Sequence, residues 1–135
     1  MNNNLIRFKK YLDQKSIKYE WSSDSTLLVR DYLDGVGSQA FYCDFEEDRV
    51  LKIFADVTTI KNSSKDDILE YLNEFNACKF VHALVLDDNT LRFIGSTILP
   101  VDNDEISLSF IISLSCWLGD KIKEIYPDIM KIIYR

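Results

Sequence analysis

Glycine and proline, the residues that most often interrupt regular structure, are scarce in this sequence of 135 residues, which holds only 4 glycines and 2 prolines. Such a composition excludes long flexible linkers, so residues 1–135 are interpreted as a single domain. Hydrophobic residues make up 47% of the chain and aromatic residues 13%, which is typical of a globular protein. A domain of this length buries enough apolar surface to fold without disulfide or metal staples.

Residues that bind transition metals or act as nucleophiles are also few. The three cysteines, Cys43, Cys78 and Cys116, lie far apart and the single histidine is His82. Their spacing predicts neither a disulfide framework nor a zinc site, and we expect three buried thiols in a reducing compartment. His82 is interpreted as a structural residue, because no nucleophile and orienting carboxylate can be assigned to it. No phosphate-binding, dinucleotide-binding, serine hydrolase or zinc protease motif is present. The sequence therefore predicts no enzyme, no metal and no cofactor.

Basic residues are outnumbered, with 16 against 22 acidic residues and a net charge of −6. The acidity belongs to residues 31–105, which hold sixteen acidic and six basic residues. A domain this acidic is not expected to bind nucleic acid, because neutralising phosphates requires clustered lysine and arginine. The acidic region is either a solvated surface or a docking surface for a basic partner.

Long apolar runs are absent as well. The longest apolar-rich stretch, residues 108–118, is far shorter than the ~20 residues that a membrane span needs. Near the N-terminus Arg7, Lys9 and Lys10 interrupt the apolar residues, so no secretory signal is predicted. We therefore expect a cytoplasmic protein with no membrane segment.

The hydrophobic pattern predicts an α+β fold. A period of 3.6 residues predicts helices over residues 4–15, 64–77 and 105–125, and Pro127 is expected to interrupt the last helix before a short final one at 128–134. Alternation of apolar and polar residues predicts strands at 26–32, 39–45, 49–56, 80–86 and 91–99, while residues 17–21 form a short strand or an extended link. The expected architecture is an antiparallel sheet of five to six strands with three main helices, in the order α-β-β-β-α-β-β-α.

Two features depart from this simple pattern: an amide inside the apolar arc of a helix, and a strand that is apolar on both faces. Asn76 falls between Leu69 and Leu72 on the helical wheel, inside the apolar arc, and a buried amide must find hydrogen-bond partners. We expect it to tie the end of its helix to a strand or loop, with ligand contact as the alternative. The strand at 80–86 is apolar on both faces, which predicts either a central strand covered on both sides or a sheet face kept for a partner.

The last long helix carries the candidate interaction residues. Its core stripe is formed by five apolar residues: Ile111, Leu114, Leu118, Ile122 and Ile125. Phe110 and Trp117 form a second stripe beside Leu114, and large aromatic residues outside a core often anchor interfaces. Phe110, Leu114 and Trp117 are therefore predicted to contact a second subunit or a protein partner. The alternative is that the first helix or residues 132–134 of the same chain cover the two aromatic residues.

The chain resembles the YbjN-like family, which has the fold of bacterial type III secretion chaperones. The resemblance lies in the order of the elements, in the segment Leu72-Asn73-Glu74-Phe75-Asn76 before a two-strand hairpin, and in a final helix ending near Tyr126-Pro127. The strand-like residues 17–21 are a departure from the family pattern. The resemblance implies a small acidic cytoplasmic protein, often a homodimer, that binds other proteins and carries no catalytic residues. Asn73 and Asn76 are the family-pattern positions.

The sequence thus predicts a non-enzymatic protein-binding module, chaperone-like or regulatory. Two other functions stay open. The first is an immunity or inhibitor protein that blocks a basic toxin or enzyme with its acidic central region. The second is a sensor that binds a small ligand between the sheet and the helices.

Overall fold

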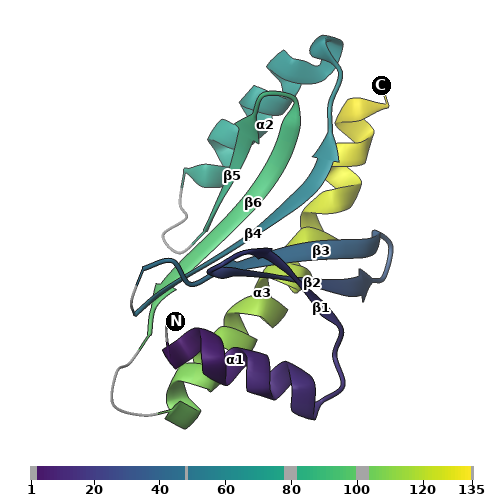
Figure 1. Ribbon diagram of the computed structural model, residues 1–135. Helices are drawn as coiled ribbons and strands as arrows, with labels where there is room; N and C mark the ends of the chain where they lie inside the picture. Colours follow the sequence, from purple (N-terminus) through teal and green to yellow (C-terminus); the bar gives the residue numbers. More distant parts are fainter. Residues whose placement is uncertain (1–2, 48, 78–81, 100–103, 135) are drawn as a thin grey trace.

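A computed structural model describes residues 3–47, 49–77, 82–99 and 104–134, and the side chains of residues 82, 104–107 and 110 lie outside the described part. Runs of consecutive strands lie between the helices, which is the α+β arrangement predicted from the sequence (Figure 1). In chain order they are α1 (Asn3–Gln14), β1 (Tyr19–Ser23), β2 (Thr26–Leu33), β3 (Gly37–Asp44), β4 (Val50–Thr59), the short 3-10 helix η1 (Asn62–Ser64), α2 (Lys65–Asn76), β5 (His82–Asp87), β6 (Thr90–Ile98) and α3 (Asp104–Ile133).

The six described strands form one antiparallel sheet in the order β1-β2-β3-β4-β6-β5. Residues 19–21 of the stretch expected to be a short strand or an extended link belong to β1, so four strands precede α2 rather than the three of the predicted order. Strand β5 contains residues 82–86 of the predicted strand 80–86 and lies at an edge of the described sheet, so these residues do not form a central strand. The edge position leaves the second interpretation, a sheet face available to a partner.

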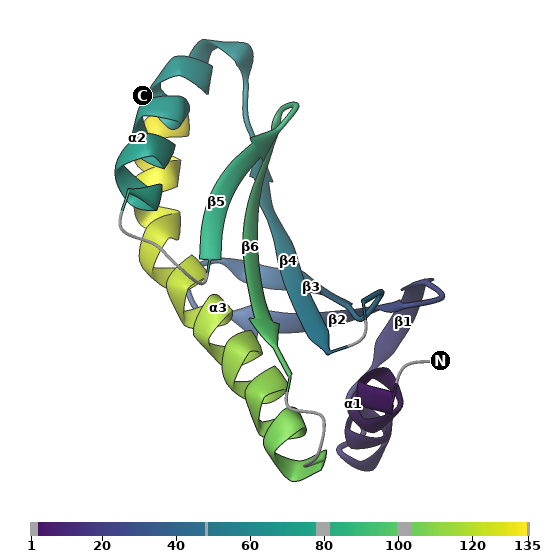
Figure 2. The same cartoon turned by 90° about the vertical axis from the view of Figure 1, so that its left-hand side faces the viewer.

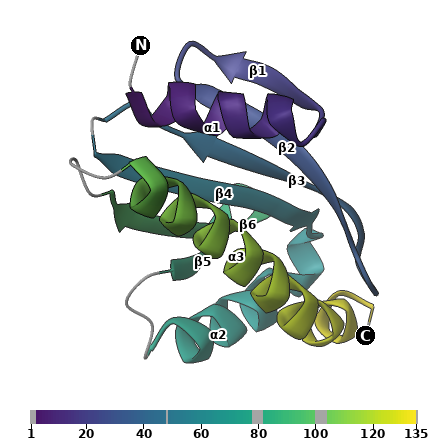
Figure 3. The ribbon, with the colours of Figure 1, turned by 90° about the horizontal axis from the view of Figure 1, so that it is seen from below.

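The three α-helices that the structure describes lie on one face of the sheet. Figure 2 shows α2 and α3 on the same side of β4, β5 and β6, and Figure 3 shows α3 between α1 and α2. Two glycines bring α3 close to the strands: a methyl group at Gly95 of β6 would lie 3.0 Å from Leu118, and one at Gly119 would lie 3.4 Å from Leu33. The five predicted core residues of α3 are all buried, at Ile111, Leu114, Leu118, Ile122 and Ile125.

The predicted break at Pro127 is wrong, because α3 runs without interruption from Asp104 to Ile133. A proline inside a helix removes one hydrogen bond, to the carbonyl group four residues earlier. Pro127 is exposed, whereas Ile125, Ile129 and Ile132 on the other side are buried against the core. The apolar contacts on both sides of the proline hold the helix in one piece, which outweighs the loss of a single bond.

Candidate protein-binding surfaces

Asn76 ties the end of α2 to the edge strand β5, as predicted. Its Nδ2 donates a hydrogen bond to the Leu84 carbonyl at 2.7 Å, and the Leu84 N–H donates to Asn76 Oδ1 at 2.9 Å. The side-chain amide therefore takes the place of a neighbouring strand at Leu84 and blocks strand pairing at that point of the β5 edge. Asn73 is exposed on the same helix, and Leu69, which the helical wheel placed in the apolar arc, is 40% exposed.

The aromatic stripe predicted on α3 is only partly described. Leu114 is 8% exposed and belongs to the core. Trp117 is half-buried at the margin of the core, and the Lys121 ammonium lies 5.8 Å from the centre of its ring. The side chain of Phe110 lies outside the described residues. Contact of this stripe with a second subunit or a partner stays a prediction.

The thiols differ from the sequence expectation. Cys43 is buried, and burial raises the pKa of its thiol to about 12. Cys116 is exposed, so the prediction of a buried thiol is wrong there: it lies on the side of α3 away from the core stripe. Cys78 and the side chain of His82 lie outside the described residues.

Among the residues that the structure describes, no group of three or more histidine, cysteine, aspartate or glutamate side chains is placed to hold a metal ion. Within the same residues, no helix is both long and apolar enough to span a membrane.

A cleft of about 410 Å³ opens between α1, β2 and α3. Its floor is apolar and is formed by core side chains that include Phe8, Leu12 and Phe41. Four further apolar residues line it and are only half-buried, so the cleft is accessible to another molecule: Tyr11, Ile17, Val29 and Ile112. A cleft of this size and character lies within the range of ligand and peptide sites.

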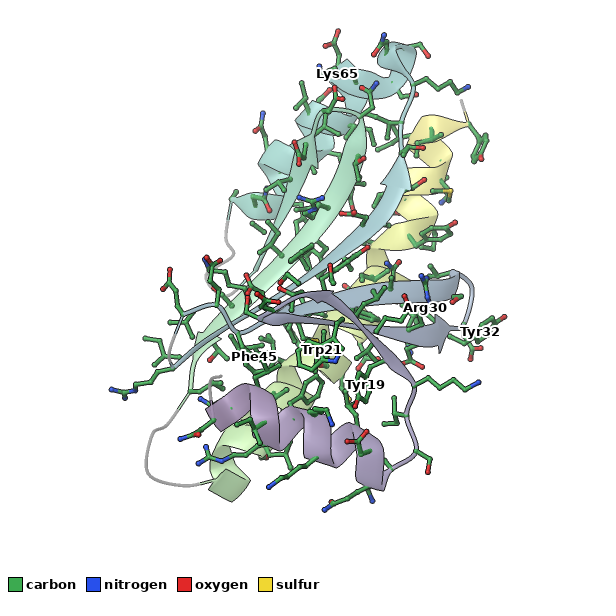
Figure 4. All side chains as sticks on the ribbon, viewed as in Figure 1. Tyr19, Trp21, Arg30, Tyr32, Phe45 and Lys65 are labelled. Atoms are coloured by element: carbon green, nitrogen blue, oxygen red, sulfur yellow. The ribbon has the colours of Figure 1, made fainter. Side chains whose placement is uncertain are left out.

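The cleft runs along an open edge of the sheet. The described pairing of β1 with β2 ends at Val29, and in the described residues no strand covers residues 30–33 on that side. All four of these residues line the cleft. Consecutive side chains of a strand point to opposite faces of the sheet. Four consecutive residues can therefore line one cleft only if the cleft runs along the edge of the strand. Arg30, Asp31 and Tyr32 are exposed, and Figure 4 shows Arg30 and Tyr32 near this end of β2.

The second surface is the sheet face opposite the helices, which we call the open face. Cross-strand pairing aligns five apolar residues of this face in one row, here named the apolar row: Leu28, Tyr42, Phe54, Ile94 and Ala83. The rings of Tyr42 and Phe54 stack at 4.8 Å with an angle of 5° between their planes. Two strongly exposed apolar residues share the face with this row, Tyr32 at 72% and Ile98 at 71%.

Charged residues flank the apolar row on β4. Lys52 and Asp56 lie two residues before and two residues after Phe54, and all three point to the open face, because Ile53 and Ala55 between them are buried on the helix side. The Arg92 guanidinium pairs with Asp56 at 2.6 Å and stacks 5.2 Å from the centre of the Phe54 ring. Lys52 is exposed and has no ion pair among the described residues.

The carboxylates of α2, which belong to the acidic central region, lie apart from the cleft. Four carboxylates occupy the exposed side of α2: Asp66, Asp67, Glu70 and Glu74. Helix α2 lies on the other side of α3 from α1, as Figure 3 shows. A partner attracted by these charges would therefore not occupy the cleft between α1 and α3.

Comparisons with known proteins support the fold. No protein family model matches the chain, and no curated protein matches its sequence. Among solved structures, the chain is similar to YbjN from E. coli, a proposed transcription regulator, with a TM-score of 0.63 and 18% sequence identity over 92% of each chain. This likeness confirms the resemblance to the YbjN-like family at the level of the fold.

Proposed function

We propose that this protein is a non-enzymatic, cytoplasmic binding module, chaperone-like or regulatory, which holds an extended apolar segment of another protein in the cleft between α1 and α3. The observation that carries the proposal is the open edge of β2 along an apolar cleft. An extended segment could pair its backbone with residues 30–33 while every second side chain enters the cleft. Backbone pairing supplies affinity for many sequences, and the apolar floor selects segments with alternating apolar residues.

The likeness to YbjN supports a regulatory role, and the secretion-chaperone fold supports a role in holding unfolded segments. Both roles are compatible with capture of a protein segment, and neither requires catalytic residues. The opposite edge of the sheet supports the choice of site, because Asn76 blocks pairing at Leu84 of β5 whereas nothing described closes the end of β2. The outer edge of β1 is also unpaired in the described residues, but β1 does not line the apolar cleft, whereas the end of β2 does.

Cys116 provides a chemical handle inside the cleft, since it is exposed and lines it. In a Cys78→Ser background, a benzophenone attached to Cys116 should crosslink to one extended segment of the partner, identified by mass spectrometry. Ile112→Arg should abolish this crosslink, because it places a charge in the apolar cleft. A benzophenone at Ser63→Cys, on η1 and away from the cleft, is the matched control, in a chain whose Cys116 is also replaced by serine. Equal crosslinking from both positions, or full crosslinking by Ile112→Arg, would show that the cleft is not the site.

Salt separates this proposal from an acidic inhibitor. Raising the salt from about 0.1 M to about 1 M shortens the screening length from about 10 Å to about 3 Å. Binding in the cleft should survive this change, because apolar contacts carry it. Loss of binding, together with a dependence on Glu70 and Glu74, would support the immunity or inhibitor function. Crosslinking that a small molecule from the cell extract prevents would support the ligand sensor.

Trp117 is tested separately as a predicted contact. The double variant Phe110→Ala, Trp117→Ala should stay folded and lose a partner or a second subunit, as judged by light scattering and thermal melting. A variant that keeps its oligomeric state and partner but loses much of its stability would place both residues in the core of one chain.

A further inference from the structure

We propose that the open face is the interface of a symmetric homodimer, in which the apolar row of one copy packs on the same row of a second copy. All three described α-helices lie on the other face, so no described helix covers the row; within it Leu28 is 8% exposed and the other four residues are half-buried. A contiguous apolar row across five strands resembles one half of a β-sandwich core, in which two sheets stack about 10 Å apart. This inference concerns a different surface from the cleft and does not depend on the proposed function.

The charges beside the row select a second copy as the occupant. On β4, Lys52 and Asp56 are placed symmetrically about Phe54 and carry opposite charges. A twofold axis running along the row would place β4 of one copy antiparallel over β4 of the other. Phe54 would then face its own equivalent, and each Lys52 would face Asp56 of the other copy. A surface that is complementary to itself in this way fits a closed dimer.

The twofold axis of two stacked sheets lies in the plane between them and can run along the row or along β4. The same charges exclude the axis along β4. A twofold axis along β4 would place Lys52 over Lys52 and Asp56 over Asp56, so that like charges repel at both positions. With the axis along the row, the residue two positions before each row member faces the residue two positions after it in the other copy. On β2, β3 and β6 these facing pairs also avoid like charges. They are Arg30 with Thr26, Ala40 with Asp44, and Arg92 with Ser96. Asp56 already accepts two hydrogen bonds from Arg92, at 2.6 and 3.4 Å, which hold its carboxylate on the open face.

Two charge-reversed variants test this geometry. In the homodimer of Lys52→Glu, both facing pairs would consist of two carboxylates, and in that of Asp56→Lys, both would consist of two ammonium groups. Each variant should dimerise at least about tenfold more weakly than the unaltered chain in sedimentation or light-scattering titrations. An equimolar mixture of the two should form a heterodimer of nearly the original affinity, since each facing pair then joins one carboxylate to one ammonium group. Lys61→Glu, outside the sheet, is the control and should change nothing.

A second pair of variants leaves the Asp56–Arg92 pair intact. Because each residue of the row faces its own equivalent, Ile94→Lys and Ile94→Glu should each weaken the homodimer, and their mixture should restore it. Thermal melting confirms that every variant is folded. Three results would overturn the proposal: an unaltered chain that is monomeric at about 100 µM, single variants that dimerise as well as the unaltered chain, or mixtures that fail to restore binding. A partner protein lost from Ile94→Lys while the unaltered chain is monomeric would assign the face to that partner instead.

Discussion

Asn76 should contribute more to stability than any other polar side chain of α2, although sequence alone shows only an amide in an apolar arc. Its amide oxygen and nitrogen satisfy both backbone groups of Leu84, whose side chain is fully buried. Asn76→Ala leaves the N–H and the C=O of Leu84 without partners. A fully buried, unsatisfied backbone group costs about 1–3 kcal/mol, and these two hydrogen bonds are only partly buried, so their combined loss should be about 2–4 kcal/mol in the free energy of unfolding. For a domain of this length the melting temperature should fall by about 8–15 °C.

The matched control is Asn73→Ala on the same helix. Asn73 is exposed, so its replacement should change the stability by less than about 0.5 kcal/mol, and the higher helix propensity of alanine favours a small gain. Urea unfolding followed by circular dichroism gives both values on one scale. Equal stabilities for Asn73→Ala and Asn76→Ala would refute the reasoning, because the two variants differ mainly in the hydrogen bonds to Leu84.

A third variant, Asn76→Asp, tests the direction of the hydrogen bonds. A carboxylate still accepts a hydrogen bond from the Leu84 N–H, but it repels the Leu84 carbonyl oxygen. Protonation of the carboxyl group relieves this repulsion. The folded-state pKa of this aspartate should therefore lie above its unfolded value. Its contribution to stability is then present at low pH and is lost as the pH rises through the folded pKa. Relative to Asn73→Asp, the variant should be least destabilised in acid. A difference between the two variants that does not vary with pH would contradict the assigned geometry.

Three further predictions concern other elements. Pro127→Ala should stabilise the protein by about 1–2 kcal/mol in urea unfolding, because it restores a hydrogen bond inside the continuous helix α3; an unchanged or lower stability would contradict this. A thiol reagent at pH 8 should modify Cys116 in the folded protein and Cys43 only after unfolding, since burial raises the pKa of Cys43 to about 12; peptide mapping reads both sites, and early labelling of Cys43 would show an open core. Gly95→Val should destabilise by about 1–3 kcal/mol in thermal melting, because its side chain would collide with Leu118, and a neutral result would mean that α3 shifts freely.

Local patterns were sufficient where one element decides the outcome. The α+β class, the antiparallel hairpins, the core stripe of α3 and the anchoring role of Asn76 follow from periodicity and from the need of a buried amide for partners. Each of these features depends on the spacing of residues within one element or between elements that are adjacent in the sequence, which the sequence displays directly.

Errors arose where distant contacts decide the outcome. Residues 19–23 form β1 because β2 offers them an edge, where the sequence left both a strand and a link open for 17–21, and α3 continues through Pro127 because Ile125 and Ile129 are held by the core. Leu69 has the polarity of a core residue, yet no described element covers it, and Cys116 lies on α3 facing away from the core stripe. The apolar row was hidden for the same reason: its members are spread over five strands, and only the register between those strands brings them into line.

The cleft and the open face place different demands on the sheet, and the fold keeps them apart. The cleft lies on the helix side and along the edge of β2, whereas the apolar row lies on the other face and is centred on β4. A dimer through the open face would therefore leave both clefts uncovered. The two copies of β2 would lie antiparallel across the twofold axis, so their free ends at residues 30–33 would point in opposite directions. Each cleft would then receive its own segment, and a partner with two such segments would gain affinity from binding both at once.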